Sequence, residues 1–124
     1  MFFGNQEFLG IFSVADTGTD FKVGNFLHIV EAKLMRVAAT VLERLTTDAS
    51  MDIAFKREDA DGNVHNLGAS LTIDSTVEKG DQACIFSWTG WSLYDGDVLI
   101  VSIATTGEPV AGKVALWASF AARR

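Results

Sequence analysis

Turn-forming residues recur about every ten positions along this chain, and short apolar segments rich in β-branched residues lie between them. The clearest turn spans residues 58–63 and has an Asp-Gly pair at its tip. Before it, Met51, Ile53 and Phe55 alternate with polar residues, as in a strand with one buried face. This rhythm is typical of a β-sandwich or a β-barrel, and we predict an all-β fold, a single-domain antiparallel β-sandwich that spans residues 1–124.

The expected strands follow these turns. Residues 26–45 fit a helical apolar stripe as well as a strand, but their β-branched content favours a strand over residues 33–43. Residues 1–25, with a strand-like run over 8–15, form either an N-terminal arm or an extra strand, and both interpretations stay open. Further strands are expected over residues 51–57, 64–67, 70–74, 83–88, 97–104 and 113–121.

Composition argues against several classes of partner. The net charge of −6 disfavours nucleic acid and anionic membranes, because both are polyanions. Apolar residues make up 48% of the 124 positions, which is enough for a core that needs neither metal nor disulfide. Cys84 is the only cysteine, so an intrachain disulfide is impossible, and we predict that it is a small core residue.

The segment from Asp97 to Ala121 carries the strongest strand signal. Two apolar runs flank a loop that holds the only proline, which predicts a hairpin with a long loop. Alternate residues should face the core from the two runs: Leu99, Val101, Ile103, Val114, Leu116, Ala118 and Phe120. The outward positions are also apolar: Val98, Ile100, Ala115 and Trp117. Because a sheet that is apolar on both faces must be covered, we expect the N-terminal segment or another subunit to cover it.

The predicted core joins this segment to the strand before the Asp-Gly turn. We expect one buried cluster of Ile53, Phe55, Leu99, Val101, Val114, Leu116 and Phe120. The first 26 residues hold six phenylalanines, which pack either on their own domain or on a neighbouring molecule.

No residue pattern points to catalysis. The two histidines, His28 and His65, lack ligand spacing, and a calcium-loop alignment through Gly62 places Arg57 and Gly68 at ligand positions. We therefore interpret Asp59 and Asp61 as parts of a plain turn, and we predict no enzyme activity, no metal and no cofactor. Trp88 and Trp91 flank a Thr-Gly pair, and surface tryptophans of this kind can stack on sugar rings. A carbohydrate-binding module is therefore the alternative to core or interface aromatics.

The order of these elements resembles that of the small jelly-roll virion proteins of tailed bacteriophages, the capsid decoration or cement proteins. The resemblance covers roughly residues 33–121. It runs from the strand at Lys33-Leu-Met-Arg-Val-Ala-Ala-Thr-Val through Ile53-Ala-Phe-Lys-Arg and Leu71-Thr-Ile-Asp to the last two strands. Those are Tyr94-Asp-Gly-Asp-Val-Leu-Ile-Val and Gly112-Lys-Val-Ala-Leu-Trp-Ala-Ser-Phe. It is a resemblance in element order and carries no binding residues over.

The resemblance implies a jelly-roll sandwich with a structural role on the outer surface of a virion, made in the host cytoplasm. Its partners would be the major capsid protein and copies of itself, with a trimer as first choice and a dimer as second. A carbohydrate- or receptor-binding module of a phage fibre remains the alternative. On either interpretation, we expect interface contacts from the apolar and aromatic residues left outside the core: Val98, Ile100, Trp117, Trp88 and Trp91.

Overall fold

The computed structural model describes the backbone of residues 2–123 and the side chains of residues 6–121. Within this range the chain forms eight strands and one turn of 3-10 helix, and no helix is long and apolar enough to cross a membrane. The elements in order are β1 (Phe2–Ser13), the 3-10 turn η1 (Val14–Asp16), β2 (Thr19–Asn25), β3 (Glu31–Glu43), β4 (Ser50–Glu58), β5 (Val64–Asp74), β6 (Gln82–Tyr94), β7 (Val98–Thr106) and β8 (Lys113–Arg123).

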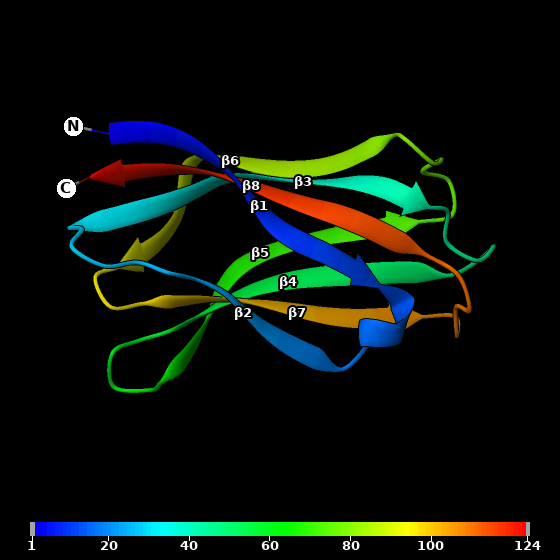
Figure 1. The fold of residues 1–124 in the computed structure, drawn as a ribbon, viewed down its shortest axis with the longest axis horizontal. Helices are drawn as coiled ribbons and strands as arrows, with labels where there is room; N and C mark the ends of the chain where they lie inside the picture. Colours follow the sequence, from blue (N-terminus) through cyan, green and yellow to red (C-terminus); the bar gives the residue numbers. More distant parts are fainter. Residues whose placement is uncertain (1, 124) are drawn as a thin grey trace.

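The strands form two four-stranded antiparallel sheets packed face to face (Figure 1). One has the order β1-β8-β3-β6 and is called the β8 sheet below; the other has the order β2-β7-β4-β5 and is called the β7 sheet. The chain is one long hairpin folded over on itself. Its paired strands are β1 with β8, β2 with β7, β3 with β6, and β4 with β5. This is the jelly-roll order, and it confirms the predicted antiparallel sandwich.

The tip of that long hairpin is the predicted Asp-Gly turn between β4 and β5. The Asp59 carboxylate accepts hydrogen bonds from the backbone N–H groups of Asp61 and Asn63, at 3.0 and 2.9 Å. Gly62 has a φ of 86°, a conformation that glycine adopts without steric cost. The local sequence therefore determines where the chain reverses.

The closing segment does not form the predicted hairpin. β7 and β8 lie in different sheets, and the loop between them crosses from one sheet to the other. The Thr46 hydroxyl accepts hydrogen bonds from the backbone N–H groups of Val110 and Ala111, and Gly107 packs against the backbone of Asp48. These contacts hold the loop across the end of the sandwich. The correction leaves the inward faces unchanged, because apolar residues of both strands meet in the shared core.

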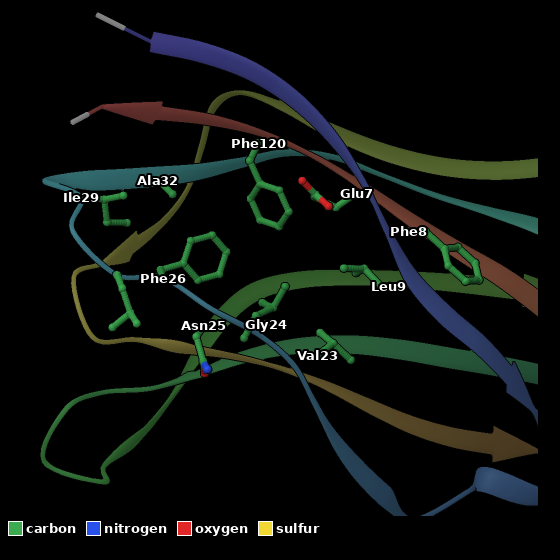
Figure 2. A pocket seen from close by; sticks show the side chains of 12 residues that line it. Glu7, Phe8, Leu9, Val23, Gly24, Asn25, Phe26, Ile29, Ala32 and Phe120 are labelled. Atoms are coloured by element: carbon green, nitrogen blue, oxygen red, sulfur yellow. The ribbon is translucent and has the colours of Figure 1, made fainter.

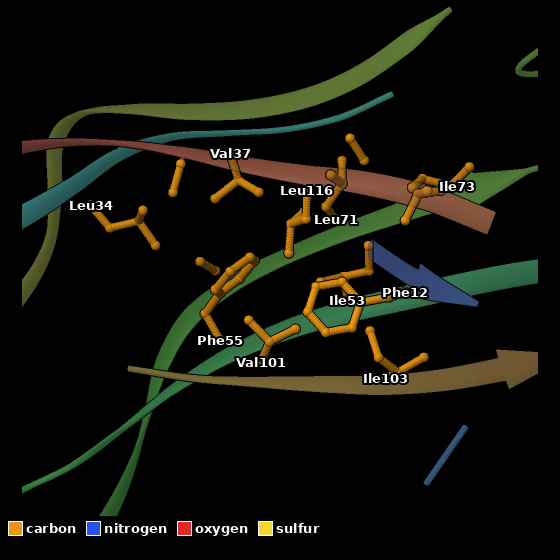
Figure 3. Packing of buried hydrophobic residues seen from close by; sticks show 14 of the residues in the cluster. Phe12, Leu34, Val37, Ile53, Phe55, Leu71, Ile73, Val101, Ile103 and Leu116 are labelled. Atoms are coloured by element: carbon orange, nitrogen blue, oxygen red, sulfur yellow. The ribbon is translucent and has the colours of Figure 1, made fainter. Parts of the chain in front are cut away.

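The core lies between the two sheets and contains every residue of the predicted cluster (Figure 3). Phe55 reaches inward from β4 and is 1% exposed, and Val101 is its direct neighbour on β7. Leu116 projects from β8 toward them and is fully buried. Alternation therefore predicts the buried face of the central strands correctly.

The N-terminal region contributes two strands to the sandwich. β1 pairs with β8, and β2, which the sequence did not predict, pairs with β7 at the edge of the other sheet. Phe12 packs edge-to-face on Phe21 at 5.1 Å between ring centroids, so these aromatic side chains fill the core of their own subunit. Phe2 and Phe3 lie outside the described side chains.

Two predicted strands are longer than expected because each contains a bulge. β5 continues through Gly68, and β6 continues through residues 87–90, where four residues lie opposite Met35 of β3. Cys84 is exposed, which contradicts the predicted core position. Its neighbours on β6, Ala83 and Ile85, take the inward sites and pack against the core.

The end of the sandwich near the β6–β7 turn is held by a buried carboxylate. Asp97 is 2% exposed, accepts the backbone N–H of Tyr94 at 2.8 Å and forms an ion pair of 3.3 Å with Arg57. The Arg57 guanidinium lies 5.3 Å from the centre of the Tyr94 ring. These contacts join β4, β6 and β7 at one corner.

Candidate functional site

The outer face of the β8 sheet carries a row of apolar side chains that crosses all four strands. Phe8, Trp117, Ala38 and Cys84 are direct cross-strand neighbours on β1, β8, β3 and β6. The Phe8 and Trp117 rings are 4.8 Å apart, and Phe8 remains 50% exposed. Ala38 is only 1% exposed although it points outward, because larger neighbours flank it.

A second row continues the apolar surface toward the end of the sheet where the β7–β8 loop enters β8. Ile11 of β1 lies beside Ala115 of β8, and Ala115 lies beside Thr40 of β3. Ile11 is 56% exposed, whereas Ala115 is nearly buried. Gln82 closes this row on β6, where its amide donates a hydrogen bond of 3.3 Å to the Thr40 hydroxyl. The apolar surface therefore ends in polar residues at its rim.

The bulge in β6 places two more aromatic rings at the edge of the sheet. Trp88 is 88% exposed and Phe86 is 60% exposed, and their rings meet edge-to-face at 5.5 Å. The bulge is held by a hydrogen bond of 3.1 Å from the Gly90 N–H to the Ser87 hydroxyl. A Cβ atom at Gly90 would lie 2.7 Å from Lys33 Cβ, so this turn requires glycine. The local backbone thus holds Trp88 outward.

We define the apolar face as the eight outward apolar side chains of the β8 sheet that lie in these two rows and at the β6 bulge. The neighbouring cross-strand row consists of Gln6, Ser119, Arg36 and Phe86, so Phe86 is the apolar end of an otherwise polar row. The members of the apolar face are Phe8, Ile11, Ala38, Cys84, Phe86, Trp88, Ala115 and Trp117.

The outer face of the β7 sheet has the opposite chemistry. Lys22 pairs with Glu58 at 3.0 Å, and Lys56 lies 3.8 Å from Asp20. Asp20 also accepts a hydrogen bond of 2.5 Å from the Ser102 hydroxyl. Such exposed ion pairs keep a surface solvated and add little stability. The two outer faces of the sandwich therefore differ: exposed aromatic rings gather on the β8 sheet, and ion pairs cross the β7 sheet.

The five predicted interface residues do not lie together. Trp117 and Trp88 are on the apolar face, whereas Trp91 points inward beside Leu34 and packs against the core. Val98 and Ile100 face outward from the other sheet, because β7 and β8 are not partners. Ile100 is only 5% exposed, and its cross-strand neighbours are Lys22 and Lys56. Lysine stems can cover an apolar residue in this position.

Besides Cys84, which was predicted to be buried, three exposed residues of the apolar face were not predicted: Phe8, Ile11 and Phe86. A signal for them exists in the sequence, since Phe8 precedes a glycine bulge that moves Leu9 inward and leaves Phe8 beside Trp117. Phe86 alternates with the inward Ile85. The pairing of β1 with β8 was the information that the sequence did not supply.

The titratable residues that the sequence singled out make structural contacts. His65 Nε2 lies 2.8 Å from Asp59 Oδ2 at the β4–β5 hairpin. This hydrogen bond, together with the backbone N–H of Asn63, holds the pKa of Asp59 below its usual value. The backbone N–H of His28 donates a hydrogen bond of 2.6 Å to the Asp95 carboxylate. Among the residues that the structure describes, no group of three His, Cys, Asp or Glu side chains could hold a metal ion.

Comparison with known proteins adds no relative to this description. No protein-family model matches the chain, and no curated protein matches it.

Proposed function

We propose that this chain is a structural virion protein of the capsid decoration or cement type, which associates with copies of itself through the apolar face and stabilises an assembled phage head. The observation that carries this proposal is the contrast between the two outer faces of the sandwich. A monomer gains nothing from the exposed rings of Phe8, Phe86 and Trp88 on one sheet, whereas exposed apolar patches are typical of protein interfaces.

The size of the β8 sheet suits such an interface. Four strands at about 4.8 Å spacing, with the 11 residues of β8 at about 3.3 Å each, cover about 700 Å². A stable protein interface buries about 800 Å² per partner. The arrangement of the face also fits, because the Trp117 ring lies on the inner strand β8, whereas Gln6 and Gln82 lie on the edge strands β1 and β6 at the rim.

Closed symmetry is the expected form of this association, since open association produces fibres. The resemblance to decoration proteins favours a trimer, and a dimer is the second choice. The jelly-roll order supports the resemblance at the level of the fold alone, because one fold serves many functions.

Sedimentation of the purified protein tests the self-association. We expect the wild type to sediment as a closed oligomer at micromolar concentration and Trp117→Lys to sediment as a folded monomer, because a charge would be buried at the centre of the interface. Since Trp117 is half-buried on Phe8, Phe86→Lys provides a second variant at a more exposed position. The matched control is Ala104→Lys on the outer face of the other sheet, which should stay oligomeric.

A monomeric wild type, or equal sedimentation of all three variants and the wild type, would refute association through the apolar face. The capsid role has a separate test, in which the protein is mixed with assembled phage heads that lack decoration and pelleted. We expect saturable binding to heads and none to unassembled capsid protein. Absence from the pellet would refute the decoration role while leaving the oligomer result intact.

A second function, binding of a carbohydrate on a receptor, is favoured by one specific observation. Trp88 borders a shallow pocket of about 320 Å³ with Lys33, Met35 and Thr89. An exposed indole next to polar groups can stack on a sugar ring. Glycan-array binding that Trp88→Ala abolishes, with unchanged sedimentation, would support this function over self-association of the whole face.

A further inference from the structure

Two hollows in the described surface adjoin the apolar face, and they differ in their polar groups. The larger is a cleft of about 380 Å³ between the edge strands β1 and β2, where Phe26 and Phe120 meet edge-to-face at 5.2 Å (Figure 2). Glu7 and Gly24 lie in its walls, and Glu7 already has an interaction partner. Phe8 lines this cleft and also belongs to the apolar face, so the cleft is a continuation of that face.

The smaller hollow, the shallow pocket beside the β6 bulge, has an unpaired cation next to it. Arg36 follows the pocket residue Met35 on β3. It forms no hydrogen bond or ion pair with any residue that the structure describes. The residues that line the pocket itself are Lys33, Met35, Trp88, Thr89 and Ala121.

The Arg36 side chain points outward from the β8 sheet. Its cross-strand neighbours are Ser119 of β8 and Phe86 of β6. The next residue, Val37, is fully buried on the inward side, so Arg36 shares the outer face with the Phe86 ring. The Phe86 ring in turn meets the Trp88 ring at 5.5 Å. The cation and the aromatic pair are therefore neighbours on one surface.

The carboxylates of this sheet lie away from Arg36. Along the described residues of its four strands, the acidic residues are Glu7, Glu31 and Glu43. Glu7 borders the cleft, whereas Glu31 and Glu43 are the first and last residues of β3, and Glu31 lies 4.0 Å from Lys33. Arg36 is partly buried near the middle of that strand. A guanidinium in this position can bind an external carboxylate through two parallel hydrogen bonds.

We infer that the bulge pocket and Arg36 bind a carboxylated sugar, whose ring stacks on Trp88 and whose carboxylate pairs with Arg36. This inference rests on the second function proposed above, carbohydrate binding, and names the class of ligand. Trp88 is 88% exposed, so its indole is free to stack. The hydroxyls of Ser87 and Thr89, 3.3 Å apart at the bulge, are available to sugar hydroxyls. An acidic peptide would pair with Arg36 without needing the indole.

A matched pair of sugars tests the inference. Methyl β-glucuronide and methyl β-glucoside share the same ring and differ by one carboxylate. Their binding is followed by saturation-transfer NMR at low salt, with protein at low micromolar concentration because an oligomer through the apolar face would cover Phe86. We expect the glucuronide to bind about fivefold more tightly. The net charge of −6 opposes this preference, so general attraction to the protein would not produce it.

Three variants assign the preference to the site. Arg36→Gln should reduce it to less than about twofold and leave glucoside binding unchanged, because only the carboxylate loses its partner. Trp88→Ala should weaken both sugars by about fivefold or more, because both stack on the indole. Lys56→Gln is the matched control, since it removes the same charge from the outer face of the other sheet and should bind like the wild type.

The outcomes separate this inference from the functions on which it rests. Equal binding of the two sugars, or an unchanged preference in Arg36→Gln, would overturn the carboxylate assignment and leave carbohydrate binding standing. If neither sugar binds at millimolar concentration, both fail, while the sedimentation test of self-association is unaffected. Hexaglutamate that binds as tightly as the glucuronide, with both ligands indifferent to Trp88→Ala, would assign the site to an acidic peptide and overturn the inference.

Discussion

The sharpest test of the packing is the substitution Phe55→Ala. Phe55 is 1% exposed, lies on the central strand β4 and projects between the sheets beside Val101 (Figure 3). Losing the transfer free energy of a buried phenylalanine costs about 1.5–3 kcal/mol. The cavity that remains raises the loss to about 3–5 kcal/mol, because a β-sandwich core relaxes only in part.

Phe86→Ala is the matched control, because it makes the same chemical change at a side chain that is 60% exposed. The transfer contribution then falls to about 1 kcal/mol, and no enclosed cavity forms. Both variants are unfolded in urea and followed by circular dichroism. With a slope near 2 kcal/mol/M, the midpoint should fall by about 2 M for Phe55→Ala and by about 0.5 M for the control.

Self-association could add to either value, so the titrations are repeated at two protein concentrations. A core effect does not change with concentration, whereas an interface effect does. If Phe55→Ala fails to fold, Phe55→Leu is the milder variant, with an expected loss of about 1.5 kcal/mol or less. A loss below about 1 kcal/mol for Phe55→Ala, or one equal to that of the control, would refute the assignment of this strand face.

Three further outcomes follow from individual contacts. Asp97→Ala should lower the free energy of unfolding by about 2–3 kcal/mol in thermal or urea melts, because it leaves a partly buried arginine and a backbone N–H without their acceptor. His65→Ala should raise the pKa of Asp59 toward its ordinary value in a carboxyl NMR titration. Because the pKa of Asp59 is lowered in the folded state, its carboxylate stabilises the fold above the unfolded pKa of 3.8, and this stabilisation is lost as the pH falls through the folded pKa. An unchanged Asp59 pKa in His65→Ala would refute this coupling. Gly90→Ala should destabilise the fold by more than Gly62→Ala, since both have positive φ and only the first Cβ meets close contacts; equal melting temperatures would contradict this.

The strand alternation was readable because burial on one face imposes a period of two. Ile53 and Phe55, and likewise Val114 and Leu116, are inward in the structure as the pattern predicts. The strand over residues 33–43 and the Asp-Gly turn are also confirmed, because β-branched content and turn chemistry act locally. β2 was missed because its seven residues include Asp, Lys and Gly, and its pairing with β7 compensates for a weak local preference.

The composition of the apolar face was decided by which strands are neighbours. Trp117 was predicted to point outward, and it does, but its neighbour Phe8 comes from a strand more than 100 residues earlier in the chain. Val98 and Ile100 were assigned to the same surface because β7 and β8 are consecutive, whereas the jelly-roll order places them on opposite sides of the molecule. Periodicity specifies the side of a strand that faces the core and carries no information about its partner.

The amino-acid sequence by itself therefore determined most of the strands, the inward faces of the central strands and the main turn, because each depends on residues close together in the chain. Only the tertiary structure decided that the loop after β7 crosses between sheets, that Cys84 is exposed, and that Glu7 and Gly24 face one cleft. Those features depend on pairing between distant segments. Such pairing is chosen by the packing of the whole core, since each strand must bury its apolar face against all the others at once.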